Sequence, residues 1–186
     1  MPLDLMETIA TQKRSPSNVD VLERSLDHFV RVMKDLVYKD EDDNRLLEWL
    51  GQYEDNTGKT IYRAEIRILE SHKYFFEHHR EHLPGLYIIE AGRQLGLAVP
   101  HLFLDVSYDY HSVLDGCDMS FTGFANLTDP LFIDAHVLNP VYRKGKLQSL
   151  SFDGTFIQNN KPIVHYQSHV RLIHARLLKR LEASRS

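Results

Sequence analysis

The sequence is poor in cysteine, in long apolar runs and in net positive charge, and each of these shortages excludes a class of protein. The one cysteine, Cys117, rules out an internal disulfide framework. No apolar run reaches the roughly 20 residues that a membrane-spanning helix needs. The opening residues, MPLDLMETIA, contain neither the basic region nor the continuous apolar core of a secretory signal. We therefore expect a cytoplasmic protein that does not associate with a membrane.

The charge balance argues against a nucleic-acid partner. The chain has 22 Lys and Arg residues against 26 Asp and Glu residues, which gives a formal net charge of -4. Such a chain has no overall field that would attract a polyanion. Its hydrophobic content of 42% and charged content of 26% are those of a globular protein, and 186 residues are enough for one domain with a real core.

The N-terminal part predicts a polar tail followed by helices. Residues 1–16 are polar and include a proline, which is typical of a tail or linker. After a cap at Ser17 or Asn18, apolar residues recur at spacings of three and four, the pattern of an amphipathic helix: Leu22, Leu26, Phe29, Val30, Met33 and Val37. A short second helix is predicted over residues 46–50. We assign residues 1–55 to a tail and helical extension and residues 56–186 to the main domain.

The main domain predicts strands around one buried helix. Tyr62, Ala64 and Ile66 alternate with charged residues, which indicates a half-buried strand. Residues 84–99 are apolar on nearly every face, with Pro84 suited to a helix start and Pro100 to its end. Further strands are predicted at 119–127, 133–137, 146–158 and 162–173, with a turn at residues 159–160.

This order of elements favours one fold class. A strand, a long buried helix and then several antiparallel strands with short connections predict an α+β protein of hotdog type, in which a curved sheet wraps around a central helix. Here the predicted hotdog domain carries an N-terminal helical extension. Its sheet has an open edge and a half-covered face, so we expect a second copy to cover them in a homodimer.

Glu90 stands inside the apolar sequence of the predicted helix. A carboxylate buried there must be paired, hydrogen-bonded or kept protonated with a raised pKa. Arg93 and Gln94 lie three and four residues further on, so they share a helix face with Glu90. A catalytic carboxylate and a structural pairing with Arg93 or with another copy are both consistent with this pattern.

Three histidines, His78, His79 and His82, occupy the loop that leads into the helix. The first helical amides, at Gly85 and Leu86, are free to donate hydrogen bonds to an oxyanion. A histidine, a carboxylate that can be held protonated and an oxyanion donor are together the parts of an acyl site. Each histidine alone fits equally well as an ordinary loop residue. His78 and His82 have the i, i+4 spacing of metal ligands, but no further ligands complete a set, so we expect no metal.

The stretch from His78 to Gln94 resembles the signature of the A-factor biosynthesis hotdog proteins. The matching residues are His78, Glu81-His82-Leu83-Pro84-Gly85 and Glu90-Ala91-Gly92-Arg93-Gln94. Glu81 stands where aspartate is usual in that family, and His79 where proline is common. More distantly, the loop histidine and helix glutamate resemble the catalytic pair of β-hydroxyacyl carrier-protein dehydratases, whose two residues come from different subunits.

The closer resemblance implies an acyltransferase of specialised metabolism of the butenolide, γ-butyrolactone or polyketide type. Such an enzyme moves a β-ketoacyl group from a carrier-protein thioester to a glycerol-type hydroxyl acceptor such as dihydroxyacetone phosphate. The implied catalytic residues are His78 as the base, Gly85 as the oxyanion donor and Glu90 as the group that positions acceptor or base. The implied substrate-binding residues are His79, His82, Arg93 and Gln94. No cofactor is implied beyond the phosphopantetheine of the carrier, or coenzyme A, that bears the acyl group.

Two alternatives remain open at this point. The dehydratase resemblance implies loss of water from a β-hydroxyacyl thioester, with thioester hydrolysis as a close variant. The other alternative is a noncatalytic acyl-binding subunit. Two groups of basic residues are suited to an acidic carrier protein, or else are simply solvated: Arg143, Lys144 and Lys146, and Arg171, Arg176, Lys179 and Arg180.

Overall fold

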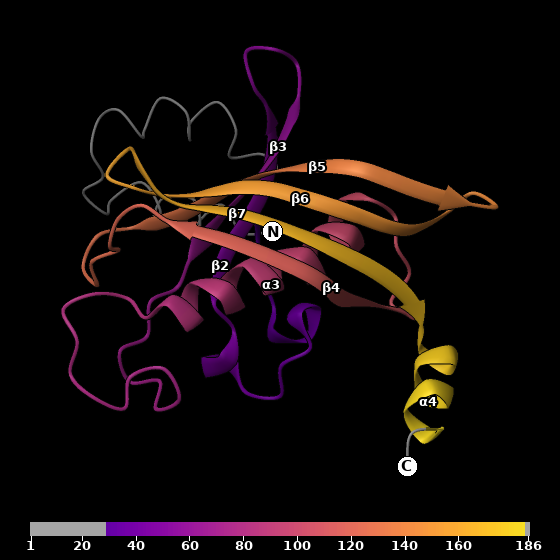
Figure 1. Cartoon of the computed structure of the whole chain (residues 1–186), viewed down its shortest axis with the longest axis horizontal. Helices are drawn as coiled ribbons and strands as arrows, with labels where there is room; N and C mark the ends of the chain where they lie inside the picture. Colours follow the sequence, from indigo (N-terminus) through magenta and orange to yellow (C-terminus); the bar gives the residue numbers. More distant parts are fainter. Residues whose placement is uncertain (1–28, 185–186) are drawn as a thin grey trace, which may run out of the picture.

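The structure is a computed structural model that describes residues 29–184, and its centre is one antiparallel sheet (Figure 1). Seven strands pair in the order β1-β2-β3-β5-β6-β7-β4. Their bounds are β1 Val30–Arg31, β2 Leu47–Glu54, β3 Thr60–Ile66, β4 Tyr110–Phe121, β5 Leu131–Arg143, β6 Lys146–Gln158 and β7 Lys161–His174. The helices are two short 3-10 segments, η2 Lys34–Val37 and η3 Asp42–Asn44, then α3 Gly85–Phe103 and α4 Ala175–Ala183. The predicted hotdog-like α+β fold is confirmed.

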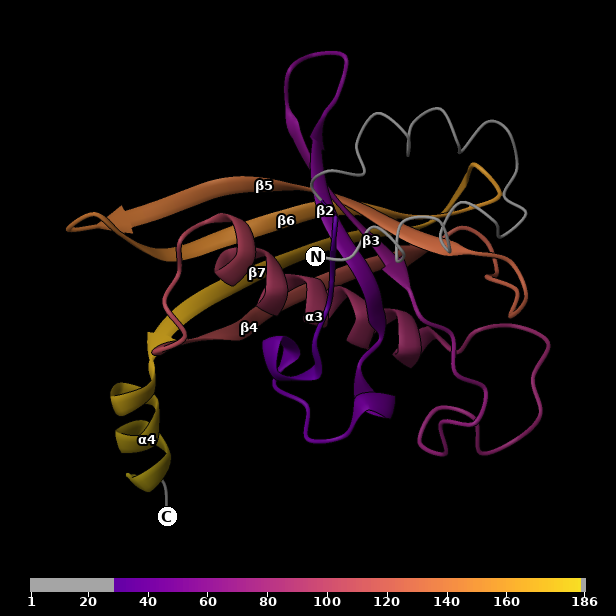
Figure 2. The ribbon, with the colours of Figure 1, turned by 180° about the vertical axis from the view of Figure 1, so that it is seen from behind.

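The long helix α3 lies across one face of the sheet, as Figure 2 shows. Its residues are buried on nearly every side, so the all-round apolar pattern correctly predicted a core helix. Pro100 does not end it, because α3 continues to Phe103. The amide hydrogen that proline lacks is missing only in the last turn, where it costs a single helical hydrogen bond.

Strands form as predicted where apolar residues, which face the core, alternate with polar residues, which face solvent. In β3, Tyr62, Ala64 and Ile66 are buried as predicted. The turn between β6 and β7 has Asn159 and Asn160 at φ 53° and 60°, the left-handed conformation that asparagine tolerates better than most residues.

The helices expected in the N-terminal part are not found among the described residues. Residues 17–28 of the first expected helix lie outside them, and the rest forms β1 and the single 3-10 turn η2. The second expected helix is wrong, because residues 47–54 form β2, which pairs with β3. A bulge between Leu47 and Trp49 places Leu47 and Leu50 in the core at a spacing of three, which imitates a helical pattern. Strand β2 therefore pairs across the boundary expected at residue 55.

Strand β4 begins and ends earlier than the predicted strand at 119–127. It spans Tyr110–Phe121, forms the edge of the sheet and is bulged between Leu114 and Gly116. An edge strand with a bulge has no regular alternation, which explains why its first half escaped the pattern. Beyond Phe121 the chain turns away, and the carbonyl of Ala125 accepts a hydrogen bond from the amide of Leu83 at 2.8 Å. No helix among residues 29–184 has both the length and the apolar character of a membrane span.

Two glycines, Gly92 and Gly96, allow α3 to approach the sheet closely. A Cβ atom built on Gly92 would lie 2.9 Å from Cε2 of Tyr166, and one on Gly96 would lie 3.2 Å from Cγ2 of Val170. The hydroxyl of Tyr166 also donates to the carbonyl of Gly92 at 3.0 Å. The position of α3 over β7 therefore depends on the absence of a side chain at residue 92.

We expect Gly92→Ala to lower the free energy of unfolding by about 1–3 kcal/mol, because the new methyl group overlaps a buried ring that cannot move freely. Gly116→Ala is the control, since nothing lies within 4 Å of the Cβ position there. Urea denaturation of both variants measures the difference. Equal stability of the two would show that the contact between α3 and β7 is not tight.

Candidate active site

The carboxylate of Glu90 is held by three side chains. Arg93 binds it through two bonds, Nε to Oε2 at 2.7 Å and Nη2 to Oε1 at 2.8 Å. Nε2 of Gln94 donates to Oε1 at 3.0 Å, and Nζ of Lys39 lies 2.9 Å from the same oxygen. Glu90 is thus a half-buried carboxylate, with 19% of its side chain exposed, that has ample compensation for its lost water.

These partners decide the protonation state of Glu90. Burial alone would raise its pKa, but the hydrogen bonds from Arg93, Gln94 and Lys39 outweigh burial and lower the pKa to about 2. Of the three states that the sequence left open for Glu90, the structure thus favours the paired and hydrogen-bonded one over the protonated one. The helix sequence around Glu90 is apolar, but the groups that contact the carboxylate are not.

Gln94 links Glu90 to the N-terminal segment. Its side chain is fully buried, its Oε1 accepts from the amide of Leu46 at 2.8 Å, and its Nε2 also donates to the carbonyl of Asn44 at 2.8 Å. We expected Gln94 to bind substrate, but its amide is occupied by backbone groups and by Glu90. Its place in the structure is that of a positioning residue.

Lys39 is the member of this cluster that the sequence did not indicate. It follows η2, in a segment expected to be helical extension, and lies 51 positions before Glu90 in the sequence. The preceding residue, Tyr38, has a left-handed backbone with φ 54°, and the amide of Lys39 donates to the carbonyl of Lys34 at 3.0 Å. No local sequence motif predicts the contact between Lys39 and Glu90.

The first turn of α3 is open, as the sequence predicted. Pro84 is the N-cap, and its carbonyl accepts from the amides of Tyr87 and Ile88 at 3.0 and 3.4 Å. Within residues 29–184 no acceptor is found for the amides of Gly85 and Leu86, so both can donate to an anionic oxygen.

An exposed apolar rim surrounds this helix start. The side chain of Phe124 is 80% exposed, and Leu86 and Phe121 are also largely exposed. Phe121 contacts the first turn directly, since its ring would lie 3.4 Å from a Cβ on Gly85. In such an arrangement the amides could bind the carbonyl oxygen of an acyl group, and the exposed apolar side chains could contact its hydrocarbon chain.

The three loop histidines do not contact Glu90 within the described chain. His78 and His79 are exposed and make no hydrogen bond or ion pair with any other described residue. His82 is half-buried, and its ring lies 4.8 Å from that of Phe124 between centroids. The structure thus brings together Glu90, Arg93 and Gln94 from the predicted set, keeps His82 at the rim, and leaves His78 and His79 in the loop.

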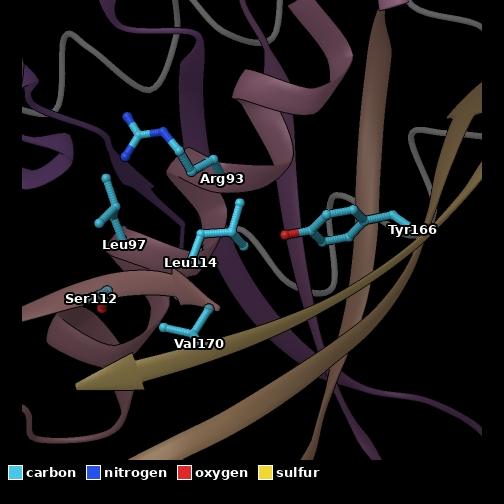
Figure 3. A pocket seen from close by; sticks show the side chains of 7 residues that line it. Arg93, Leu97, Ser112, Leu114, Tyr166 and Val170 are labelled. Atoms are coloured by element: carbon cyan, nitrogen blue, oxygen red, sulfur yellow. The ribbon is translucent and has the colours of Figure 1, made fainter. Parts of the chain in front are cut away.

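The space beside Arg93 is small in a single copy of the chain. Figure 3 shows Arg93 and Leu97 of α3 near Ser112 and Leu114 of β4. The cavity between these elements has a volume of about 10 Å³, room for one water molecule and not for an acyl chain. Among residues 29–184, no three His, Cys, Asp or Glu side chains gather in a way that would hold a metal ion.

A sheet wrapped around one long helix, with a charged group on the helix and an open helix start, defines a protein of the hotdog class. Solved structures support this class. The dehydratase heterocomplex ApeI:P from Xenorhabdus doucetiae matches with a TM-score of 0.59 and 17% identity, over 82% of this chain and 98% of that one. A hot-dog-like protein from Thermanaerovibrio acidaminovorans matches with a TM-score of 0.55 and 16% identity, over 68% and 90%. Thioesterase HI1161 from Haemophilus influenzae matches with a TM-score of 0.53 and 11% identity, over 73% and 85%.

The family is more specific than the fold. The family model of the A-factor biosynthesis hotdog domain matches residues 23–174, and the chain belongs to this family. The resemblance seen in residues 78–94 is therefore confirmed. Membership is consistent with acyl-thioester processing in A-factor biosynthesis and indicates an enzyme that handles acyl thioesters. A search of curated proteins found no match.

The lowered pKa of Glu90 predicts a pH-dependent contribution to stability. Because the pKa is about 2 in the folded chain and 4.5 ordinarily, the contribution is fully present above pH 4.5 and is lost as the pH falls toward 2. We expect Glu90→Gln to cost about 3 kcal/mol at most near pH 7, and the difference from the unaltered chain to shrink below about pH 4.5.

Urea denaturation at a series of pH values measures this difference. The control is Glu81→Gln, which removes an exposed carboxylate from the preceding loop and should give a small difference at all pH values. A Glu90→Gln difference that stays constant down to pH 2.5 would mean that Glu90 is not ionised by its partners.

Proposed function

We propose that the protein is an acyltransferase that moves a β-ketoacyl group from a carrier-protein thioester to a hydroxyl of a glycerol-type acceptor such as dihydroxyacetone phosphate. The pathway would be specialised metabolism of the butenolide, γ-butyrolactone or polyketide type. Membership of the family supports thioester chemistry. The observation that carries the choice of transfer is the ionised Glu90 beside the open start of α3.

The proposed step uses groups in or near this site. The acceptor hydroxyl oxygen attacks the thioester carbonyl carbon while a histidine, His78 by preference, takes its proton. The amide of Gly85 stabilises the oxyanion of the tetrahedral intermediate. The carbon–sulfur bond then breaks, and the sulfur leaves as a thiol with the proton from the histidine. The products are the acylated acceptor and the free carrier thiol.

An ionised Glu90 is better suited to transfer than to dehydration. In dehydration the carboxyl group would have to protonate the departing hydroxyl, and a group with a pKa of about 2 carries almost no proton at neutral pH. In transfer the carboxylate needs only to accept a hydrogen bond from the acceptor or the base. The same reasoning makes Glu90 a weak base, so the proton goes to a histidine.

The residues around Glu90 suggest how an acceptor would be held. Arg93 is one-third exposed and Lys39 about one-quarter exposed, so both retain capacity for a second anionic partner such as the acceptor phosphate. His79 and His82 are proposed to line the entrance, since His82 packs on the exposed ring of Phe124. Gln94 contributes by holding Glu90 in place.

We also propose that the active form is a homodimer joined along β4. Among residues 29–184 this strand forms one of the two edges of the sheet, and Leu114 and Phe121 on it are exposed apolar residues. The cavity beside Arg93 is too small for an acyl chain in one copy. We propose that a second copy joined along β4 supplies the remaining wall of the acyl channel.

The functional proposal is tested by product analysis. The protein is incubated with β-ketoacyl and β-hydroxyacyl carrier thioesters, with and without dihydroxyacetone phosphate, and the products are followed by mass spectrometry. We expect the unaltered protein to consume the thioester only when the acceptor is present. The Glu90→Gln variant should be folded at pH 7 but should lose most of this activity. His78→Asn should lose more activity than His79→Asn or His82→Asn.

Each alternative function predicts a different result in this experiment. Loss of water from the hydroxyacyl substrate means dehydration, and acceptor-independent release of free acid means hydrolysis. Binding without any turnover means a noncatalytic subunit. Full activity of Glu90→Gln would reduce Glu90 to a structural group.

The dimer is tested by sedimentation equilibrium. We expect the unaltered chain to have the mass of two copies and Leu114→Arg to shift it toward one copy, because a charge would enter the joined edge. Met33→Arg is the matched control, since Met33 is an exposed apolar residue beside β1 at the opposite edge. A monomeric unaltered chain, or a dimer that Leu114→Arg leaves intact, contradicts pairing along β4.

A further inference from the structure

The C-terminal helix α4 has no core to pack against. It is nine residues long, and none of its residues is buried. Leu177 and Leu181 lie on one side with 51% and 47% of their surfaces exposed, and Arg176, Lys179 and Arg180 supply positive charge. An isolated helix of this length is only marginally stable in water, so its leucines need a partner surface.

The tip of the hairpin formed by β5 and β6 also has little to pack against. Beyond Ala135, β5 pairs only with β6, and the residues of β6 before Ser149 pair only with β5. The chain reverses at Lys144 and Gly145, both with positive φ. Tyr142 is 58% exposed on this two-stranded ribbon, which on its own is also marginal.

Both elements lie at the same end of the sheet, where α4 projects away from the tip of the hairpin (Figures 1 and 2). The Nζ atom of Lys146 at the hairpin tip lies 5.6 Å from the ring centroid of Tyr110. That ring lies 5.2 Å from the ring of His174, which caps α4 by accepting a bond from the amide of Arg176. Tyr110 thus links the hairpin at Lys146 to the start of α4 at His174, and residues 138–148 together with residues 175–183 are called here the basic end.

The charge of the basic end differs from that of the whole chain. Six basic side chains belong to it: Arg143, Lys144, Lys146, Arg176, Lys179 and Arg180. Three acidic side chains lie in α4 or in the adjoining loop: Asp105, Asp109 and Glu182. The excess is positive, whereas the whole chain has a net charge of -4. Such a local excess around exposed apolar residues favours an acidic partner.

We propose that the basic end is the docking surface for the acidic carrier protein that delivers the acyl thioester, an inference that rests on the proposed function. A few exposed apolar side chains surrounded by charges have the composition of a protein interface. A membrane-bound helix would need a broader apolar face than the leucines of α4 provide. A nucleic acid would meet carboxylates on the same surface and no basic field from the rest of the chain.

The position of the basic end implies delivery to the other copy. Helix α3 has 19 residues and is about 28 Å long, and the basic end adjoins its C-terminal end, far from the open first turn of the same copy. If the two β4 strands pair antiparallel in the proposed homodimer, the Tyr110 end of one lies beside the Phe121 end of the other. Phe121 contacts the start of α3, so a carrier docked on one copy would face the active site of its partner.

Charge reversal separates docking from chemistry. We expect Lys179→Glu/Arg180→Glu to raise KM for a β-ketoacyl carrier thioester about tenfold with kcat unchanged, because both reversed charges are remote from the reacting atoms. The KM for the same acyl group on coenzyme A, which has no carrier to dock, should not change. Lys59→Glu is the control, since it reverses an exposed charge in the turn between β2 and β3.

Binding is also measured without turnover. Fluorescence anisotropy with labelled, unacylated holo-carrier should show tight binding at low salt that Lys179→Glu/Arg180→Glu weakens about tenfold and Lys59→Glu does not. Unchanged carrier binding by the double variant overturns the docking surface, whatever the activity. Salt-dependent carrier binding that the double variant loses, with no turnover of any thioester, upholds the docking surface and rejects the proposed function.

A membrane role is a distinct outcome. The unaltered chain and the double variant are sedimented with vesicles of equal parts phosphatidylcholine and phosphatidylserine. We expect no binding by either protein. Vesicle binding that the double variant loses, together with unchanged carrier binding, would assign the basic end to an anionic membrane and overturn the proposal.

Discussion

The ionised carboxylate of Glu90 is the constraint on which the rest of the site depends. A charge on a mostly buried helix is tolerated only if its lost water is replaced, and here Arg93, Gln94 and Lys39 replace it. Two of these partners come from the same helix, but Lys39 comes from a segment that precedes the first long strand. Gln94 adds bonds to the backbone at residues 44 and 46. The charge thereby fixes the N-terminal segment to α3.

This arrangement limits the chemistry that the helix can perform. A carboxylate with several strong donors is held in one orientation and gives up its role as a proton donor at neutral pH. It remains an acceptor of hydrogen bonds, and a substrate hydroxyl is the natural group to supply one. The oxyanion donors lie at the start of the same helix, about one turn and a half away. In the proposed transfer reaction, this helix would therefore set the spacing between the carboxylate that orients the hydroxyl and the amides that stabilise the oxyanion.

The sequence predicted the parts of the molecule in which a regular pattern reports burial directly. The alternation in β3 and the all-round apolar α3 indicated the hotdog fold, and the residues after His78 indicated the family. The errors have local causes. A bulge gave β2 the spacing of a helix, and an edge position deprived β4 of alternation. The sequence placed Arg93 and Gln94 on the same helix face as Glu90, but it did not indicate Lys39, because Lys39 is distant in sequence and follows a residue with a left-handed backbone.

The elements with least support from the core are those that the proposed homodimer and the proposed carrier docking would use. Among residues 29–184, strand β4 has a free edge, α4 has no buried residue, and the tip of the hairpin between β5 and β6 pairs only with itself. Each would be marginal alone, because a short helix or a two-stranded ribbon does not offset the conformational entropy it loses. The apolar side chains that these elements expose can recover that loss only by contact with a partner. Because Arg93 and Leu97 of α3 line a cavity together with Ser112 and Leu114 of β4, contacts made along β4 by a second copy would also change the environment of Arg93. In the proposed homodimer, association and chemistry would therefore be linked through the same edge of the sheet.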